Sequence, residues 1–226
     1  MTTYFPSLAG VRAFSTHAGF NICHYAGADP DQVAADLRRL RQLTGAAIRF
    51  PRQVHGTRVA TLTDAPADLE GVDALVTATP GQLLCISTAD CLPLLLVDPV
   101  ARVIGAAHCG WRGTVAGIAP KTVEAMTALG ATPANIHAAM GPCICPACFE
   151  VGEEVAAQFP AEAVIRQGYP KPHVSLEKAV ALQLHAAGVR TIAYPTACSK
   201  ESADLYSVRR QGPTLPFRTL TAILLV

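Results

Sequence analysis

Reactive side chains gather at the ends of two apolar segments near the middle of the chain. Asp90 and Cys91 precede the segment Leu92–Val97, and His108 follows the segment Val103–Ala107. A rigid scaffold that delivers a carboxylate, a thiol and an imidazole to the ends of its segments is a common way of building an active site. We therefore predict that the active site lies here.

His55, Cys91 and His108 could together bind one metal ion. Two imidazoles and one thiolate are three zinc ligands, and they leave the fourth coordination position open for water or substrate. Zinc then lowers the pKa of its bound water towards neutrality and supplies hydroxide. The three residues lie far apart in the sequence, so their spacing does not show that they meet. The alternative is that each is an ordinary core or loop residue.

A second group of candidate metal ligands is the cysteine run Cys143, Cys145 and Cys148. Three cysteines so close together could bind zinc or part of an iron–sulfur cluster, with Cys198 or His137 as a further ligand. The alternative, favoured by the flanking proline and apolar residues, is a constrained loop whose thiols pack as small apolar groups.

Arg112 is a candidate ligand for phosphate. It lies just before a predicted helix, whose free backbone N–H groups attract anions, and a guanidinium binds phosphate oxygens with two hydrogen bonds. Arg209 and Arg210 could provide a second anion contact, although pairing with surface carboxylates is the simpler role for them. Trp111, the only tryptophan, could stack on a flat base or simply pack in the core.

Strands and helices that would position these residues alternate irregularly along the chain. The two central apolar segments are short and separated by a turn signal, which predicts two buried strands. Further strands are expected near residues 48–50, 58–62, 72–77, 136–140, 191–194 and 217–226, after an opening strand and loop over 4–24. Helices are expected over residues 29–43, 114–129, 152–159 and 175–187.

The order of these elements predicts an α/β fold. Pro120, inside the predicted helix over 114–129, indicates either a kink or a new helix with the proline in its first turn. The irregular alternation and the lack of a glycine-rich phosphate loop argue against a doubly wound nucleotide-binding fold. We expect a single layered domain over residues 1–226, with a mixed β-sheet core flanked by helices.

Composition excludes several classes of function. Half of the residues are hydrophobic and only 15% are charged, which suits a chain with a large core. A net charge of +1 gives no electrostatic reason to expect nucleic acid as a partner. Without a long apolar run or a signal-peptide pattern, we expect no membrane partner and a cytoplasmic location. The eight cysteines are therefore expected to be reduced. Composition makes no prediction of oligomeric state.

Five blocks of sequence resemble, in order, the signature blocks of the YfiH/laccase-domain family. The order of the five blocks makes the resemblance specific, and the resemblance covers nearly the whole chain, from Phe14 to Arg210. Members are also called purine nucleoside phosphorylases of the laccase-domain type, and formerly polyphenol oxidases. The blocks are Gln53–Gly56, Asp73–Thr77, Thr88–Pro93, Ala106–Gly113 and Gly141–Ile144.

The resemblance implies a layered α/β domain with a zinc ion bound by His55, Cys91 and His108. It also implies phosphorolysis of adenosine and inosine to ribose 1-phosphate and free base, the same reaction on methylthioadenosine, and some adenosine deamination. Purine nucleosides and phosphate are then the expected partners, and copper is a less favoured metal than zinc. The candidate residues for contact with substrate or phosphate are Arg112, Ser15 and Arg209.

Four positions depart from the pattern of this family. His17 stands where arginine is usual, Cys109 where alanine is usual, and Cys145 where glycine is usual. Ala147 replaces one member of a cysteine pair and leaves Cys148. The change at His17 bears most on function, because an arginine there could bind phosphate. It concerns the preferred substrate more than the fold or the metal.

Asp90 and Cys91 are the candidate catalytic residues. In deamination, zinc would supply hydroxide to attack C6 of adenine while a carboxylate moves the proton. Asp90 can do this only if the strand begins after it, since neighbouring strand residues point to opposite faces. The alternative is that Asp90 orients a ligand histidine. In phosphorolysis, phosphate held by Arg112 and the metal would attack C1′ of the ribose.

Three other interpretations use the same residues. A Cys–His hydrolase would use Cys91 as nucleophile and His108 or His55 as base. A copper-dependent phenol oxidase would need many more histidines than the seven present. A non-enzymatic zinc protein would close the site with a fourth ligand, either Cys109 or a thiol from residues 143–148.

Overall fold

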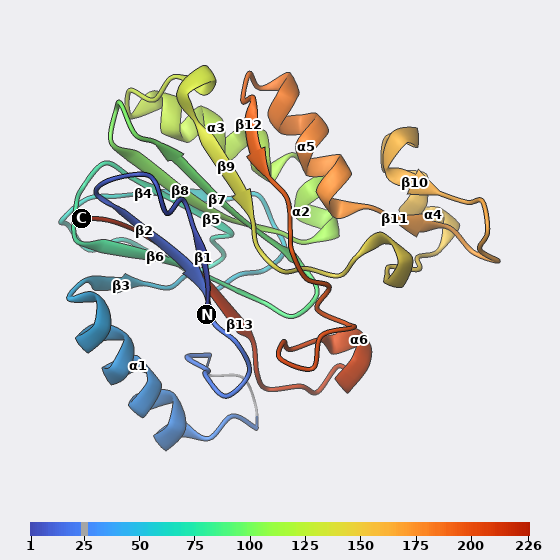
Figure 1. Cartoon of the computed structure of the whole chain (residues 1–226), viewed down its shortest axis with the longest axis horizontal. Helices are drawn as coiled ribbons and strands as arrows, with labels where there is room; N and C mark the ends of the chain where they lie inside the picture. The colour runs from blue at the N-terminus through green and yellow to red at the C-terminus, as the bar shows by residue number, and fades with distance from the viewer. Residues whose placement is uncertain (24–26) are drawn as a thin grey trace.

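Two β-sheets lie face to face between helices in the computed structural model, which describes residues 1–23 and 27–226 (Figure 1). The predicted loop over 4–24 therefore ends one residue outside the described part of the chain. The first sheet has the strand order β1 (Thr2–Tyr4), β2 (Val11–Ser15), β13 (Thr219–Leu225), β6 (Gln82–Thr88) and β3 (Ala47–Arg49). The second has the order β12 (Thr191–Ala193), β9 (His137–Met140), β7 (Leu92–Asp98), β8 (Val103–Cys109), β5 (Ala74–Thr77) and β4 (Val59–Leu62).

Both sheets are mixed, as the sequence predicted. The pairs β3–β6, β4–β5 and β9–β12 are parallel, and the remaining neighbours are antiparallel. The predicted strands agree with the structure to within two residues at their ends. Strands β1 and β6 were not predicted from the sequence. All seven residues of β6 are buried, and a strand covered on both faces lacks the apolar and polar alternation that marks an exposed one.

The central strands separate two layers of the core. Leu95 and Val97 of β7 point into the layer between the sheets, where Ile223 of β13 also packs. Leu94 and Leu96 point to the opposite face, which is covered by helices. Successive side chains of a strand point to opposite faces, so a strand that is apolar throughout divides its side chains between two layers. A continuous apolar run therefore serves two cores at once.

Helices cover the outer faces of both sheets (Figure 1). Helix α1 (Pro30–Thr44) begins at the Asp29 cap and ends at Gly45, which has φ 65°. It packs on the five-stranded sheet through Leu40. Helices α3 (Ile118–Ala128) and α5 (Leu176–Ala186) pack on the six-stranded sheet. The predicted helices over 29–43 and 175–187 are confirmed to within one residue.

The predicted helix over 114–129 is two helices. Helix α2 (Trp111–Val115) follows β8 at once, and α3 begins after Gly117, whose φ is 81°. Pro120 lies in the first turn of α3, where its missing N–H costs no hydrogen bond. Arg112 therefore lies inside the first turn of α2 rather than before it. Because α2 has only five residues and a weak dipole, an anion contact there would depend on the guanidinium itself.

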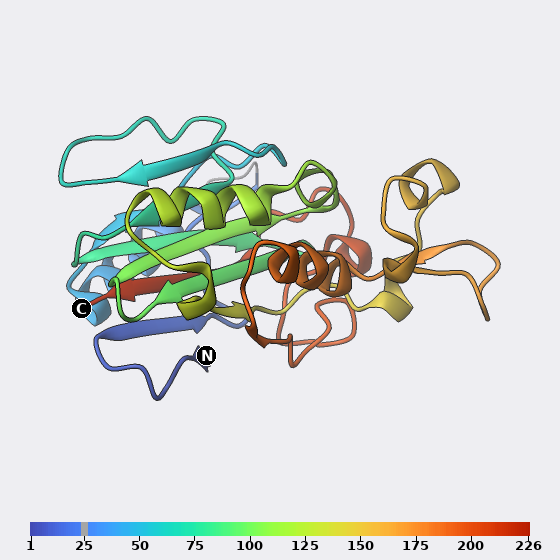
Figure 2. The same ribbon diagram turned by 90° about the horizontal axis from the view of Figure 1, so that it is seen from above.

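A smaller structure extends beyond the sheets (Figure 1 and Figure 2). It contains α4 (Glu153–Ala156) and the hairpin β10–β11 (Val164–Ile165 and His173–Val174). The predicted helix over 152–159 is thus reduced to a single turn. The chain then returns through α6 (Val208–Gln211) to β13. Among the described residues, no helix combines the length and the apolar character needed to cross a membrane.

Replacing a side chain between the sheets should weaken the fold. Leu95→Ala removes a fully buried side chain, and we expect it to lower the free energy of unfolding by about 2–5 kcal/mol. Urea denaturation followed by circular dichroism measures this. Val100→Ala is the control, since Val100 is exposed and its loss should change stability by less than about 0.5 kcal/mol. Equal effects of the two changes would contradict the layered core.

Candidate metal centre

His55, Cys91 and His108 come together at one end of the six-stranded sheet. One ligand atom of each lies within 4.8 Å of the others, and the two imidazole rings meet edge to face with centroids 4.7 Å apart. The antiparallel register of β7 and β8 explains part of this, since Pro93 lies opposite His108. Cys91, just before β7, is thereby brought close to the end of β8.

Access to this group is from one side. His108 is buried, Cys91 is partly exposed, and His55 is exposed on the turn between β3 and β4. His55 has φ 62°, a left-handed conformation that few residues other than glycine adopt. Such a conformation has to be stabilised by its surroundings. The stabilising group is a carboxylate that the sequence analysis did not identify as part of the site.

The carboxylate of Asp73 organises both histidines. Its Oδ1 contacts Nδ1 of His108 at 2.8 Å and accepts the backbone N–H of His55 at 3.0 Å. Its Oδ2 accepts the backbone N–H groups of Val54 and Gly56, at 3.2 and 2.8 Å. The side chain of Asp73 is fully buried, at the start of an apolar strand. An acidic residue directly before an apolar strand is unusual, and this was the feature of the sequence that could have identified Asp73 as part of the site.

Three titratable groups here shift one another's pKa values. Burial raises the pKa of Cys91, but the charge on His108 and hydrogen bonds from His108 and His55 lower it more, to about 6. Burial lowers the pKa of His108, but the thiolate of Cys91 and the contact with Asp73 raise it to about 9. Burial raises the pKa of Asp73, and its hydrogen bonds from His108 and Gly56 outweigh this and lower it. Without metal, the site is therefore a thiolate beside an imidazolium at neutral pH.

The donor set fits a zinc ion. Asp73 engages Nδ1 of His108, which leaves Nε2 as the ligand atom, and such carboxylate–histidine pairs are typical of zinc sites. Gly110 packs against the group: a Cβ there would lie 2.9 Å from Cδ2 of His55 and 3.2 Å from Sγ of Cys91. In the described chain, no fourth histidine, cysteine or acidic side chain joins the three. Three protein donors leave room for a reactant.

Asp90 lies beside this group but contacts neither histidine through any recorded hydrogen bond. Its Oδ1 accepts the hydroxyl of Ser199 at 2.7 Å, and its Oδ2 accepts the backbone N–H of Arg209 at 2.8 Å. The expectation that Asp90 orients a ligand histidine is therefore wrong, because Asp73 does so. Asp90 has φ 94° and precedes β7, so the condition that the strand begins after it is met.

The predicted phosphate ligands differ in accessibility. Arg112 is exposed, and its guanidinium lies 4.3 Å from the ring centroid of Trp111. Arg209 is also exposed, and its Nη2 donates to the carbonyl of Glu150 at 2.9 Å. Arg210 is not free for an anion, because its guanidinium donates to a series of backbone carbonyls, those of Ser199, Lys200, Ser202 and Leu205.

Ser15 is enclosed in the protein. It is fully buried on β2, and its hydroxyl lies 2.9 Å from that of Tyr4 and 2.6 Å from that of Thr221. Both hydrogen-bonding partners belong to the same five-stranded sheet. A hydroxyl that is buried and paired in this way cannot contact a substrate directly, so the prediction of such a contact is not supported.

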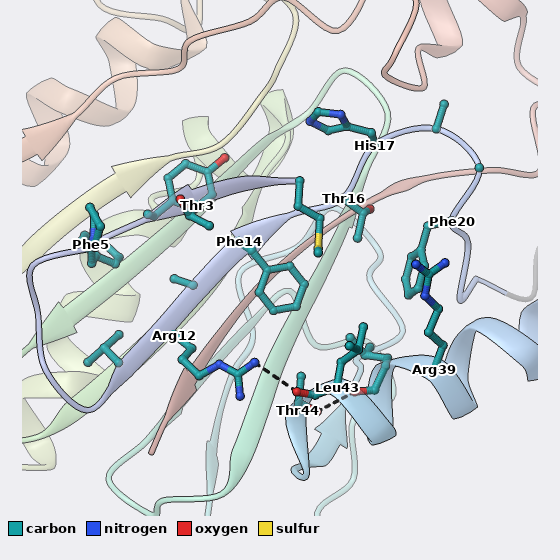
Figure 3. A pocket seen from close by; sticks show the side chains of 18 residues that line it. Thr3, Phe5, Arg12, Phe14, Thr16, His17, Phe20, Arg39, Leu43 and Thr44 are labelled. Atoms are coloured by element: carbon teal, nitrogen blue, oxygen red, sulfur yellow. Dashed lines mark hydrogen bonds between the residues drawn. The ribbon is translucent and has the colours of Figure 1, made fainter.

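A cavity of about 540 Å³ lies elsewhere, between β1, β2 and α1 (Figure 3). Its lining is largely apolar and includes Phe14 and Leu43, with His17 and Arg39 at its edges. None of the three candidate metal ligands lines it. His17 therefore lies with this cavity, and its Nε2 is 3.5 Å from the hydroxyl of Thr2.

The predicted cysteine group differs from the observed one in one member. The thiols of Cys145, Cys148 and Cys198 lie within 4.8 Å of one another. Cys143 is buried and is not part of the group, although its backbone pairs with that of Cys198. His137 is not part of it either. The strand pairing, which the sequence does not reveal, decides which cysteine approaches the other two.

Comparison with known proteins identifies the family. Residues 8–224 match the family described as multi-copper polyphenol oxidoreductase laccase. The chain is 49% identical to a purine nucleoside phosphorylase of Deinococcus radiodurans, over 92% of this chain and 86% of that protein. The chain belongs to the YfiH/laccase-domain family.

Other proteins related to the YfiH/laccase-domain family are similar to this chain in sequence and in fold. An adenosine deaminase from an unknown prokaryotic organism is 39% identical, over 91% of each chain. The crystal structure of YfiH from Bacillus licheniformis superposes with a TM-score of 0.87 at 25% identity, covering 96% of this chain and 93% of that one. YlmD from Geobacillus stearothermophilus gives 0.86 at 32% identity, covering 97% and 93%. The mixed α/β fold that the resemblance implied is confirmed.

Removing the charge of Asp73 should weaken metal binding. We expect Asp73→Asn to lower zinc affinity by about 10–100-fold, because the amide neither holds His108 nor supports the turn of His55 in the same way. Competition with a chromophoric chelator measures the affinity. Asp68→Asn, at an exposed carboxylate paired with Arg58, is the control and should leave it unchanged. Unaltered affinity in a folded Asp73→Asn protein would contradict the role of Asp73.

Alkylation should reveal the ionisation of Cys91. In the metal-free protein, we expect its rate with iodoacetamide to fall as the pH drops through about 6, because the thiolate is present above its lowered pKa. Cys85 and Cys109, whose pKa values burial raises, should react far more slowly. Peptide mass mapping across a pH series measures all three, and added zinc should protect Cys91. A midpoint near the ordinary thiol value would contradict the ion pair with His108.

Proposed function

We propose that this chain is a zinc-dependent purine nucleoside phosphorylase that acts on adenosine, inosine and methylthioadenosine, with accompanying adenosine deaminase activity. The observation that carries the proposal is the convergence of His55, Cys91 and His108 with no fourth side-chain donor among the described residues. The names of relatives that match most of the chain support it, since they are purine nucleoside phosphorylases and an adenosine deaminase.

The protein residues prepare the site for an ion. Asp73 keeps the Nε2 atom of His108 directed away from the carboxylate, and it holds the turn that presents His55. The low pKa of Cys91 keeps the third donor as a thiolate at neutral pH. A divalent ion bound there would act as a Lewis acid and would lower the pKa of a coordinated water.

Arg112 and Arg209 are the proposed phosphate ligands. Both guanidiniums are exposed, and the backbone N–H of Arg209 donates to Asp90, the neighbour of Cys91. Arg112 lies in the first turn of α2, the helix that follows Gly110, and Gly110 packs against the three candidate metal ligands. Each arginine is thus connected to the candidate metal ligands through one intermediate residue, Asp90 for Arg209 and Gly110 for Arg112. Guanidinium groups suit phosphate because they donate two parallel hydrogen bonds.

Two reactions are then available to one site. In phosphorolysis, a phosphate oxygen forms a bond to C1′ of the ribose, the C1′–N9 bond breaks, and the purine takes up a proton. In deamination, a water oxygen forms a bond to C6 of adenine, and the amino group leaves as ammonia. Asp90 is the proposed group that moves the proton in the second reaction. Its carboxylate is held by Ser199 and Arg209 at the edge of the site.

A second candidate function uses the thiol itself. The lowered pKa of Cys91 beside His108 is also what a Cys–His hydrolase requires of its nucleophile. A multicopper oxidase is less well supported, because only two histidines enter a candidate metal cluster of the described chain. The metal requirement separates the first two candidates, since a thiol nucleophile needs no ion.

Chelation should abolish phosphorolysis. We expect the dialysed, chelator-treated protein to lose formation of ribose 1-phosphate from inosine and phosphate, and zinc to restore it. His55→Ala and His108→Ala should lower the rate about 100-fold or more, because each removes a ligand of the ion. The same samples, given adenosine without phosphate, measure conversion to inosine.

A matched variant checks that these losses are specific. His137→Ala changes a histidine outside the metal centre and should retain most of the activity. Undiminished phosphorolysis by the metal-free protein, together with inactivation by iodoacetamide, would overturn the metal role and favour the hydrolase. Absence of both nucleoside reactions in zinc-loaded protein would overturn the proposed function.

A further inference from the structure

A second cluster of soft ligands lies outside the metal centre described above. The thiols of Cys145, Cys148 and Cys198 all lie within 4.8 Å of one another, and all three are partly exposed. They come from two segments of the chain: a 3₁₀ turn over Pro146–Cys148, preceded by Cys145, and the loop that begins at Cys198, 53 residues after Cys145. None of these three thiols takes part in the proposed nucleoside chemistry.

We propose that Cys145, Cys148 and Cys198 bind a zinc ion, with Glu201 as the fourth ligand. Three thiolates and one carboxylate form a closed tetrahedral set, which is the arrangement of a structural zinc site. Zinc–sulfur bonds of about 2.3 Å place the sulfurs about 3.8 Å apart, so the thiols need to move by roughly 1 Å or less.

The carboxylate is already at the cluster. Oε1 of Glu201 lies 3.6 Å from Sγ of Cys148, on the side of the loop that follows Cys198. In the first metal centre, by contrast, no described carboxylate occupies the fourth position. The two sites therefore differ in kind. The first keeps a position for a reactant, whereas the second encloses its ion once the Glu201 side chain, which does not lie within 4.8 Å of all three sulfurs, turns towards it.

Backbone groups prepare the cluster for thiolates. The N–H of Cys145 donates to Sγ of Cys198 at 3.2 Å. Burial raises the pKa of Cys198, but N–H groups of Cys145, Glu201 and Lys200 outweigh it and lower the value. Burial and the neighbouring thiols raise the pKa of Cys148 to about 12. Thiols bind zinc as thiolates, so an ion bound at the cluster would displace their protons.

The loop after Cys198 is held in shape for this role. The guanidinium of Arg210 donates to the carbonyls of Ser199, Lys200 and Ser202, at 2.7–2.8 Å. The backbone N–H of Ser199 also donates to the carbonyl of Cys143 at 2.9 Å, which joins the two segments. An ion bound by the three thiols would link the segment of Cys145 and Cys148 to the loop that begins at Cys198. It would thereby restrain the loop whose Ser199 hydroxyl supports Asp90.

Zinc stoichiometry tests the proposal. The full-length protein, reduced and reconstituted with zinc, should carry two ions per chain by native mass spectrometry. Cys148→Ser and Cys198→Ser should each lower this to one at the same free zinc concentration. Cys143→Ala is the matched control, since Cys143 lies in the same segment but outside the cluster, and it should retain two. His55→Ala combined with Cys91→Ala should also leave one ion, which is held at the cluster.

A second experiment leaves the three clustered cysteines unchanged, so its result does not depend on whether variants of those cysteines fold. In the His55→Ala/Cys91→Ala protein, zinc should slow iodoacetamide labelling of Cys145, Cys148 and Cys198 at least tenfold, as mapped by mass spectrometry. Unprotected thiols would overturn the proposal. One ion per chain in the wild-type protein, lost with His55 and Cys91, would overturn it too. A disulfide among the three that persists under reducing conditions and blocks zinc would assign the cluster to redox chemistry instead.

Discussion

A single buried carboxylate determines the geometry of the first candidate metal centre. Asp73 accepts hydrogen bonds from one imidazole and from three consecutive backbone N–H groups around His55. An ionised group without contact to water is costly unless such partners surround it. The turn of His55, with its left-handed backbone, and the orientation of His108 are therefore two consequences of one requirement. Loss of the His108 contact or of the three backbone N–H groups would leave the buried carboxylate with too few hydrogen bonds.

The two-sheet core supplies the rigidity that this arrangement needs. Asp73 precedes β5, His108 lies in β8, and Cys91 precedes β7, so three neighbouring strands deliver the charged groups to one end of the sheet. These strands are buried on both faces, which leaves them little freedom to shift. The close approach of Gly110 has the same origin, because β8 turns directly into α2 at that residue.

The loop after Cys198 connects the two candidate metal sites. It carries Cys198 and Glu201, and its Ser199 hydroxyl donates to Asp90 at the edge of the first site. The backbone N–H of Arg209, in α6, donates to the same carboxylate. The guanidinium of Arg210 donates hydrogen bonds to the backbone carbonyls of this loop. The two arginines, for which the sequence suggested surface ion pairs or an anion contact, thus have different roles. Arg210 stabilises the loop, and Arg209 stays available at the surface.

Local pattern in the sequence determined most strands, helix α1 with its Asp29 cap, and the ligand types at His55, Cys91 and His108. Periodicity and capping are properties of neighbouring residues, so they can be read without a fold. Only the tertiary structure decided that Asp73, not Asp90, holds a histidine, and that Cys198, not Cys143, joins the thiol cluster. Both outcomes depend on strand order and register, which bring distant segments together and which no local pattern encodes.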